Sequence, residues 1–158
     1  MNLVLPSRIA AETRYRDIRL AAHKAAETIV REEWAGHPNR RYPWPWQAML
    51  DNLRKNEPDR FELALWSENT LCGLAVGSTR RSFCRVDYLE GSPEPDHPLK
   101  GYVAMIMVGA VVAYATALNR PEVRLCDPIP VMTRKYQSLG FSLVTPRGEA
   151  PYCAWKVI

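Results

Sequence analysis

Carboxylates and a loop of arginine and aromatic residues are the side chains of this chain best suited to chemistry. Asp127 directly follows a predicted strand, at the end where ligands collect in α/β sheets, and is a candidate for holding a substrate. The Asp-Pro pair that it begins is equally typical of a turn or of a carboxylate that caps the next helix.

Near residue 40 a second candidate combines flat cations with indole rings, which can stack on a substrate. Its members are Arg41, Tyr42, Trp44 and Trp46. A purely structural loop of packed prolines and aromatic rings is the alternative.

Other kinds of catalytic centre are not indicated. The cysteines have neither C-x-x-C spacing nor a histidine nearby, and their apolar contexts favour reduced, buried thiols. His23 and His37 have no carboxylate or cysteine at metal-ligand spacing. The serines lack a G-x-S-x-G setting, and no glycine pattern of a nucleotide-binding loop occurs. The sequence predicts no metal site and excludes hydrolase, nucleotidase and dehydrogenase chemistry. The cysteines are Cys72, Cys84, Cys126 and Cys153.

The length and composition of the chain predict a single folded domain over residues 1–158. Hydrophobic residues make up 47% and charged residues 24% of the 158 residues, a balance typical of a globular chain with one core. The net charge of +4 is modest and mostly scattered, so it does not establish a nucleic-acid partner. The apolar run of Met1–Leu5 is too short for a signal peptide, which predicts a cytoplasmic protein.

One segment carries two interpretations. Gly101–Leu118 contains no charged residue, and an apolar run of this length is a candidate membrane span. It is diluted by glycine, alanine, threonine and two tyrosines, and it lies between segments typical of an α/β domain. A helix buried inside a domain has the same composition, so we expect a buried helix and no membrane partner.

The N-terminal third is predicted to hold two helices joined by a stiff loop. Ser7 can cap a helix that runs to about Trp34, with Ile18 and Ile29 on one apolar stripe. The prolines of Gly36–Trp46 exclude a continuing helix. A second helix begins near Pro45 and ends before Pro58, with its apolar side chains on one face.

The middle of the chain is predicted to form an antiparallel meander of three strands. Apolar residues alternate with others in Phe61–Trp66, and turn residues separate this strand from Leu71–Val76. A further turn leads to Phe83–Leu89. The prolines and glycine of residues 91–98 then end regular structure.

The C-terminal part adds a crossover. The uncharged helix is followed by a strand at Glu122–Cys126, and a strand, helix, strand order places the outer two strands parallel. A short helix over Val131–Leu139 and two last strands, 141–144 and 152–157, complete the chain. The fold class is therefore α+β (mixed α/β), with a central mixed, twisted sheet of about six or seven strands flanked by helices.

This order of elements, together with the segment Arg134–Phe141, resembles the GNAT superfamily of N-acetyltransferases. In that family a helix leads into a strand through a tyrosine that precedes Gly-Phe by three residues, as Tyr136 precedes Gly140 here. The resemblance is clearest from Phe61 to the C-terminus, and residues 1–5 would supply the family's opening strand. It implies a GNAT-like fold with acetyl-CoA as cosubstrate in a gap of the sheet and its pyrophosphate at the N-terminus of the long helix.

The resemblance also implies the residues that would contact acetyl-CoA. The family's pyrophosphate motif, Arg/Gln-x-x-Gly-x-Gly/Ala, falls on Pro98–Val103, where only Gly101 matches. Lys100 can supply the positive charge that the motif otherwise takes from its first residue. The expected cosubstrate contacts are Tyr88, Leu89, Lys100, Gly101, Tyr102 and Val103.

In the family's direct mechanism an amine attacks the thioester, which requires a base for the amine and an acid for the departing thiolate. Tyr136, by its place in the motif, is the expected acid, and a tyrosine that only packs on the last strands is the alternative. Glu90, at the end of the third meander strand, is the expected base, with Asp87 and His97 as further candidates. A solvated strand-end carboxylate is the alternative for Glu90. The arginine and aromatic loop would line the acceptor site.

Two functions from different classes follow. The first is acetyl-CoA-dependent N-acetyl transfer to a primary amine of a small molecule, a peptide or a tRNA-linked amino acid. The second is a catalytically inactive GNAT-like module that binds a protein or nucleic-acid partner, an interpretation favoured by the incomplete motif at Pro98–Val103. The acceptor and the oligomeric state, a homodimer included, are left open.

Overall fold

The N-terminal part of the chain differs from the predicted long helix. The computed structural model describes residues 18–21 and 23–157, so Ser7 and the strand expected at residues 1–5 lie outside the described residues. Ile18–Ala21 is a strand, β1, which pairs antiparallel with β2, and helical turns begin only at His23. The helix prediction is wrong over 18–21, because pairing with an open sheet edge outweighs the weak helical preference of a short apolar segment.

The predicted second helix is confirmed. Three short helical segments follow β1, namely η1 (His23–Ala26), α2 (Glu27–Ile29) and the π-helical η2 (Val30–Trp34). The irregular segment 35–45 then leads into α3 (Trp46–Asn56), which begins directly after Pro45 and buries Trp46 and Leu50.

The sheet has the predicted mixed character. In the described part of the chain it contains seven strands in the order β1-β2-β3-β4-β5-β7-β6. The meander β2-β3-β4 and the last hairpin β6-β7 are antiparallel, whereas β4 and β5 are parallel across the crossover helix α4. The remaining bounds are β2 (Arg60–Ser67), β3 (Thr70–Thr79), β4 (Phe83–Gly91), α4 (Val103–Ala117), β5 (Glu122–Cys126), α5 (Pro130–Ser138), β6 (Ser142–Val144) and β7 (Tyr152–Lys156).

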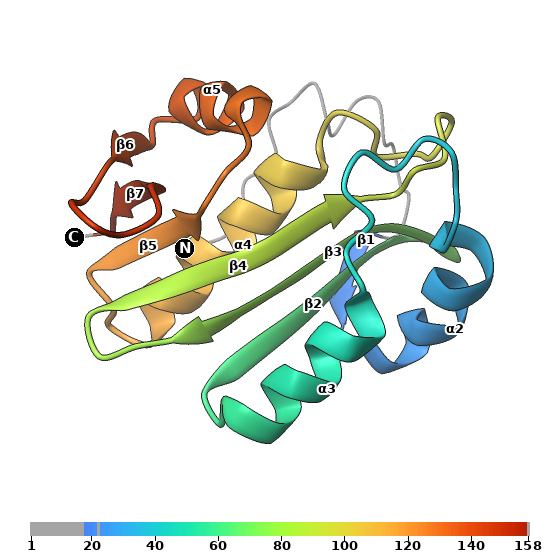
Figure 1. The fold of residues 1–158 in the computed structure, drawn as a ribbon, viewed down its shortest axis with the longest axis horizontal. Coiled ribbons are helices and arrows are strands. Elements are labelled where there is room, and N and C mark those ends of the chain that lie inside the picture. Colours follow the sequence, from blue (N-terminus) through green and yellow to red (C-terminus); the bar gives the residue numbers. More distant parts are fainter. Residues whose placement is uncertain (1–17, 22, 158) are drawn as a thin grey trace.

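Helices cover both faces of the sheet (Figure 1). Alternate residues of the meander strands face opposite sides, so Leu65 and Ala75 pack with α4 while Ala64 and Leu74 pack with α3. The uncharged segment thus forms a helix packed against the sheet, as expected. None of the helices in the described part of the chain combines the length and apolar character that a membrane crossing needs.

The parallel strands β4 and β5 separate halfway along their length. Pairing runs from Phe83 opposite Glu122 to Val86 opposite Leu125 and then stops. On its other edge β4 has a β-bulge, since Tyr88 pairs with Val76 and Val86 with Gly77, which leaves Asp87 without a partner residue. A bulge bends a strand and redirects its side chains. The sheet therefore opens between the second half of β4 and the end of β5, as the resemblance implies.

A glycine closes α5 and fixes its angle to the last hairpin. Gly140 has φ +104°, and a Cβ built on it would lie 2.5 Å from the Trp155 ring. We expect Gly140→Ala to lower the free energy of unfolding by about 3 kcal/mol, from backbone strain and overpacking together. Gly148→Ala is the matched control, because Gly148 has φ +79° with open space around it and should lose only about 1 kcal/mol. Urea unfolding measures both, and equal losses would contradict the Trp155 contact.

Candidate active site

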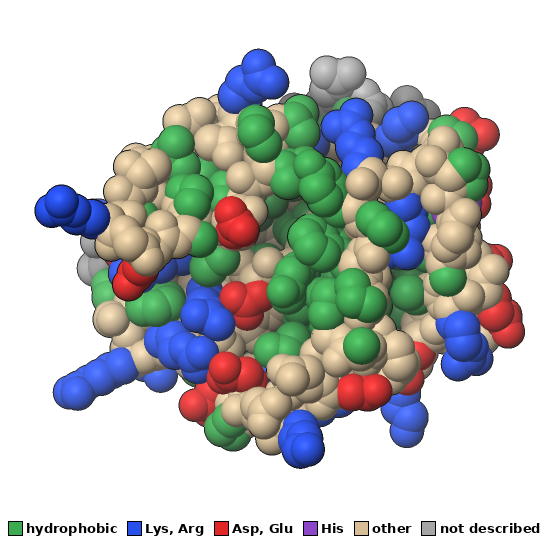
Figure 2. Space-filling model, in the orientation of Figure 1, with side chains coloured by type: hydrophobic (Ala, Val, Ile, Leu, Met, Phe, Trp, Pro, Cys, Tyr) green, Lys and Arg blue, Asp and Glu red, His purple; other side chains and the backbone are tan. Residues whose placement is uncertain are grey.

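A cavity of about 750 Å³ lies where β4 and β5 part. Its walls come from the loop before α3, α3 itself, the second half of β4, the end of β5 and α5. Figure 2 shows the corresponding hollow, lined by hydrophobic side chains and with acidic side chains along one edge. A volume of several hundred Å³ is typical of small-molecule sites.

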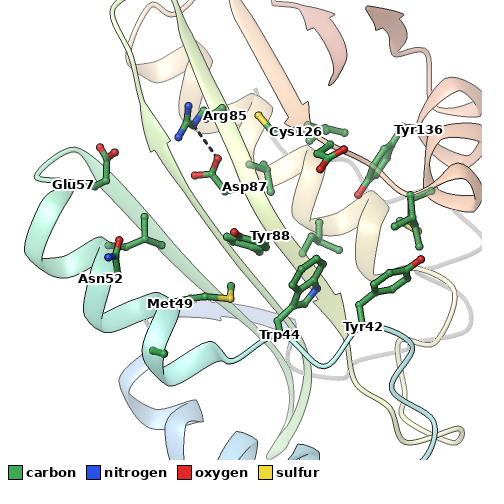
Figure 3. A pocket seen from close by; sticks show the side chains of 18 of the residues that line it. Tyr42, Trp44, Met49, Asn52, Glu57, Arg85, Asp87, Tyr88, Cys126 and Tyr136 are labelled. Atoms are coloured by element: carbon green, nitrogen blue, oxygen red, sulfur yellow. Dashed lines mark ion pairs between the residues drawn. The ribbon is translucent and has the colours of Figure 1, made fainter. Parts of the chain in front are cut away.

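Tyr136 enters this cavity from α5 (Figure 3). The side chain packs against Phe141 with 6.2 Å between ring centroids, and the residue is only 5% exposed. Burial raises the pKa of the Tyr136 phenol well above its usual range, so the hydroxyl stays protonated. Its hydroxyl makes no hydrogen bond to another described residue. A buried, protonated and unoccupied hydroxyl at the cavity wall can donate a proton.

Asp87, on the bulge of β4, also lines the cavity. One carboxylate oxygen lies 2.9 Å from Nε of Arg85 (Figure 3). Burial raises the pKa of Asp87 above its usual value, while Arg85 and Arg80 oppose this shift. A carboxylate with a raised pKa is a better proton acceptor at neutral pH than a solvated one. The bulge thus presents a basic carboxylate to the cavity.

Glu90 lies in a different environment from the one its predicted role as base requires. Both of its oxygens accept hydrogen bonds from Arg40, at 2.7 and 2.8 Å, and one also accepts from Nε1 of Trp46 at 2.7 Å. It is not among the residues that line the cavity. The geometry therefore argues against Glu90 as the base, because its oxygens already accept hydrogen bonds that fix the loop before α3 to the end of β4.

Only some of the predicted acceptor residues line the cavity. Tyr42 and Trp44 line the cavity and stack with 5.8 Å between ring centroids, and the Trp44 ring lies 4.9 Å from that of Tyr88. Trp46 is buried beside Glu90 and does not line this cavity, and Arg41 is exposed outside it. Of the four predicted acceptor residues, only Tyr42 and Trp44 therefore line the cavity.

Asp127 lines the cavity from the end of β5. It has φ +44°, a conformation that aspartate tolerates better than most residues. Helix α5 starts without a side-chain cap, so the capping alternative for Asp127 is not observed. The exposed carboxylate makes no ion pair with another described residue and is open to a ligand.

The expected cosubstrate residues fall into two groups. Tyr88 and Leu89 line the cavity, whereas the expected phosphate contacts, residues 100–103, lie outside its lining at the start of α4. Helix α4 has no side-chain cap, and its first-turn N–H groups together with the helix dipole attract anions. Gly101 has φ +85° with open space at its Cβ position, and Nζ of Lys135 donates to its carbonyl at 3.1 Å. The residues present therefore fit a pyrophosphate at this helix end.

Two further residues predicted for the site, Val103 and His97, are buried outside the cavity lining. Val103 is buried and packs on Gly73, so it points into the core. His97 is buried outside the cavity lining, and burial together with nearby Lys100 lowers its pKa. His97 is therefore not placed to act as the base in this cavity.

Cys126 lines the cavity, a position that the isolated cysteine pattern did not reveal. Burial raises the pKa of its thiol to about 11, which leaves about one thiolate in ten thousand at pH 7. We expect Cys126→Ala to keep kcat within about twofold, because so weak a nucleophile carries no acetyl group. A large loss of kcat, with an acetylated Cys126 found by mass spectrometry after mixing with acetyl donor alone, would contradict this expectation.

Arg40 is the residue that ties the acceptor loop to β4. Besides the two bonds to Glu90, it donates from Nη2 to the Trp44 carbonyl at 3.0 Å, and its side chain is only 6% exposed. We expect Arg40→Met to lower the free energy of unfolding by about 3 kcal/mol, because Glu90 is left buried and unpaired. Arg41→Met, at the exposed neighbour, should change it by less than about 0.5 kcal/mol. Thermal or urea unfolding separates the two, and equal effects would show that the ion pair contributes little.

Comparison with known proteins gives matches in structure and none in sequence. A scan against protein-family models finds no match, and a search of curated protein sequences finds none either. Among solved structures, the PaiA N-acetyltransferase of Thermoplasma acidophilum in complex with coenzyme A matches with a TM-score of 0.60 at 18% identity, over 89% of this chain and 99% of that chain.

Two other solved structures give similar agreement. The N-acetyltransferase PseH of Campylobacter jejuni in complex with acetyl coenzyme A has a TM-score of 0.61 at 15% identity, over 89% of this chain and 99% of that chain. The ribosomal-protein-S18-alanine N-acetyltransferase of Escherichia coli has a TM-score of 0.61 at 11% identity, over 87% and 91%. At these identities the likeness establishes the fold, and the GNAT-like fold predicted from the sequence is confirmed.

Proposed function

We propose that the chain transfers an acetyl group from acetyl-CoA to a primary amine by direct attack. The observation that carries this proposal is a single cavity, at the opening between β4 and β5, that has both a protonated Tyr136 and the carboxylate of Asp87 in its walls. Structural neighbours of the same fold were solved with coenzyme A or acetyl coenzyme A, which supports the choice of cosubstrate.

The two groups have complementary roles. The amine nitrogen forms a bond to the thioester carbonyl carbon, and the carbon–sulfur bond breaks. Asp87 accepts the proton that the amine loses, and Tyr136 gives its proton to the departing thiolate. Asp87 replaces Glu90 in this scheme because Glu90 is occupied by Arg40 and Trp46.

The remaining wall residues bind and orient the reactants. The N–H groups in the first turn of α4, which no side chain caps, and the nearby Lys100 and Lys135 are suited to the phosphates. The rings of Tyr42 and Trp44 provide an apolar and cation-attracting surface for the amine, and Asp127 offers a charge to it. Positive groups at one end and carboxylates at the other favour a single orientation of the two substrates.

The alternative, an inactive module that binds a protein or nucleic acid, rests on the incomplete motif at Pro98–Val103. Side chains blocking Gly101 would favour it, yet nothing lies within 4 Å of the Gly101 Cβ position. The open approach to this glycine supports the enzyme.

The test is turnover with a panel of primary amines, followed by mass spectrometry of the products. We expect an acetylated amine and free coenzyme A in equal amounts. Purified protein that transfers no acetyl group to any amine, and whose melting temperature is unchanged by millimolar acetyl-CoA, would reject the enzyme in favour of the module.

A further inference from the structure

A second cavity, of about 510 Å³, lies between α2, η2, the loop before α3, and α3. Leu74 of β3 forms part of its wall. Figure 1 shows these helical segments on the face of the sheet that carries α3. Its size falls in the range of small-molecule sites, and acetyl transfer in the first cavity gives no reason for it.

The walls of this second cavity are mostly apolar. They contain the rings of Trp44 and Trp46 with the flanking Pro43 and Pro45, and aliphatic residues that include Val30 and Leu50 complete them. Flat rings and prolines of this kind favour a ligand with an aryl or branched alkyl body.

The charged residues of the cavity indicate which polar group the ligand carries. Three charged residues line the cavity: Glu27 is paired with Arg54 at 2.8 Å, and Arg40 is paired with Glu90. Arg31 is exposed and forms no ion pair with another described residue. Among the described residues the unpaired charge at this cavity is thus positive, which favours an anion such as a carboxylate.

Local backbone geometry sets this cavity apart from ordinary helix packing. Val30 and Arg31 begin the π-helical segment η2, which runs over Val30–Trp34. π-helical turns are rare, and they occur frequently at functional sites.

The second cavity shares a wall with the first. Trp44 and Ala48 line both cavities, and the Trp44 ring lies 4.9 Å from the ring of Tyr88, which lines the first cavity. A ligand in the second cavity would therefore contact a residue of the proposed acceptor site, Trp44.

We propose that this second cavity binds a small carboxylate with an aryl or branched alkyl body, its apolar part against Trp44 and Trp46 and its charge at Arg31. The proposal does not depend on acetyl transfer, because it is tested by binding alone.

The experiment is isothermal titration calorimetry of the full chain with two ligands of similar shape, 3-phenylpropionate and 3-phenylpropan-1-ol. We expect the carboxylate to bind about threefold more tightly than the alcohol, the gain typical of an exposed ion pair. Arg31→Gln should bring the carboxylate to the affinity of the alcohol, whereas Arg81→Gln, at the exposed β3-β4 turn, should change neither.

A second variant locates the site. Ala35 is exposed and lines the second cavity only, so Ala35→Trp should fill it and abolish binding of the alcohol while the fold, checked by thermal unfolding, persists. Binding that survives Ala35→Trp, carboxylate affinity that is unchanged in Arg31→Gln, or the absence of binding for both ligands would overturn the proposal.

Discussion

The Asp87→Asn variant is expected to lose about a thousandfold in kcat/KM for an amine acceptor, because the asparagine cannot take the proton of the attacking amine. The amide has nearly the same shape as the carboxylate, so the cavity and its aromatic walls should keep their form. The measurement is steady-state turnover with an amine identified in the panel, compared with wild type at matched pH.

The pH dependence makes the Asp87 test specific. The base acts in its ionised form, and burial raises the pKa of Asp87, so wild-type kcat/KM should rise with pH through a value above the ordinary pKa of aspartate. The Asn variant should lack this rise. Glu90→Gln is the contrasting variant: it weakens the Arg40 contact and raises KM, but the rise with pH should persist. Loss of the rise in Glu90→Gln, with its retention in Asp87→Asn, would restore Glu90 as the base.

Stability provides a control for the same variant. The pKa of Asp87 is higher in the folded chain than in the unfolded chain, so its contribution to stability is present below the unfolded pKa and is lost as the pH rises through the folded pKa. At pH 7 the ionised carboxylate therefore costs stability, and asparagine removes that cost. The loss of the ion pair with Arg85 offsets part of the gain. The variant should thus remain folded, and its loss of activity is interpretable.

The Tyr136→Phe variant is expected to lower kcat by about a hundredfold while leaving the affinity for acetyl-CoA unchanged. Only the hydroxyl is removed, and it makes no hydrogen bond to another described residue, so the packing against Phe141 persists. Without a proton donor the thiolate must leave as an anion. Calorimetry for the affinity and single-turnover kinetics for the chemical step separate the two quantities.

A matched control for Tyr136 is Tyr152→Phe on β7. Tyr152 packs on the guanidinium of Arg124 and does not line the cavity, so turnover should stay within about twofold of wild type. Equal activity of Tyr136→Phe and Tyr152→Phe would mean that Tyr136 serves only as a packing residue, the alternative considered from the sequence.

Local patterns were sufficient for much of the fold. Alternation and turn residues predicted β2, β3 and β4 with the correct pairing, and the chain order predicted the parallel β5. The strand β1 was missed because a segment of four residues has too few positions to distinguish a strand from a helix. Its structure is decided by the open edge of β2, which is distant in sequence.

The same limit applies to the base that we propose. Glu90 and Asp87 lie three residues apart on β4, and composition cannot rank them. The ranking that we propose comes from Arg40 in the loop before α3 and from Trp46 at the start of α3, which both donate hydrogen bonds to Glu90 from more than forty residues earlier. It also comes from the bulge at Asp87, which lines the cavity. No local signal in the sequence marks either contact. The place of Tyr136 in the cavity wall could be anticipated because it belongs to a contiguous motif.

Binding of acetyl-CoA to the opening between β4 and β5 is the central claim, and calorimetric titration of the purified chain with acetyl-CoA tests it most directly. We predict one molecule bound per chain with a dissociation constant in the micromolar range, typical of such cosubstrates. We also predict slower iodoacetamide labelling of Cys126, which lines that cavity, measured at about pH 9 where more of its thiolate is present. The absence of binding at millimolar acetyl-CoA, or binding that leaves the labelling of Cys126 unchanged, would contradict it.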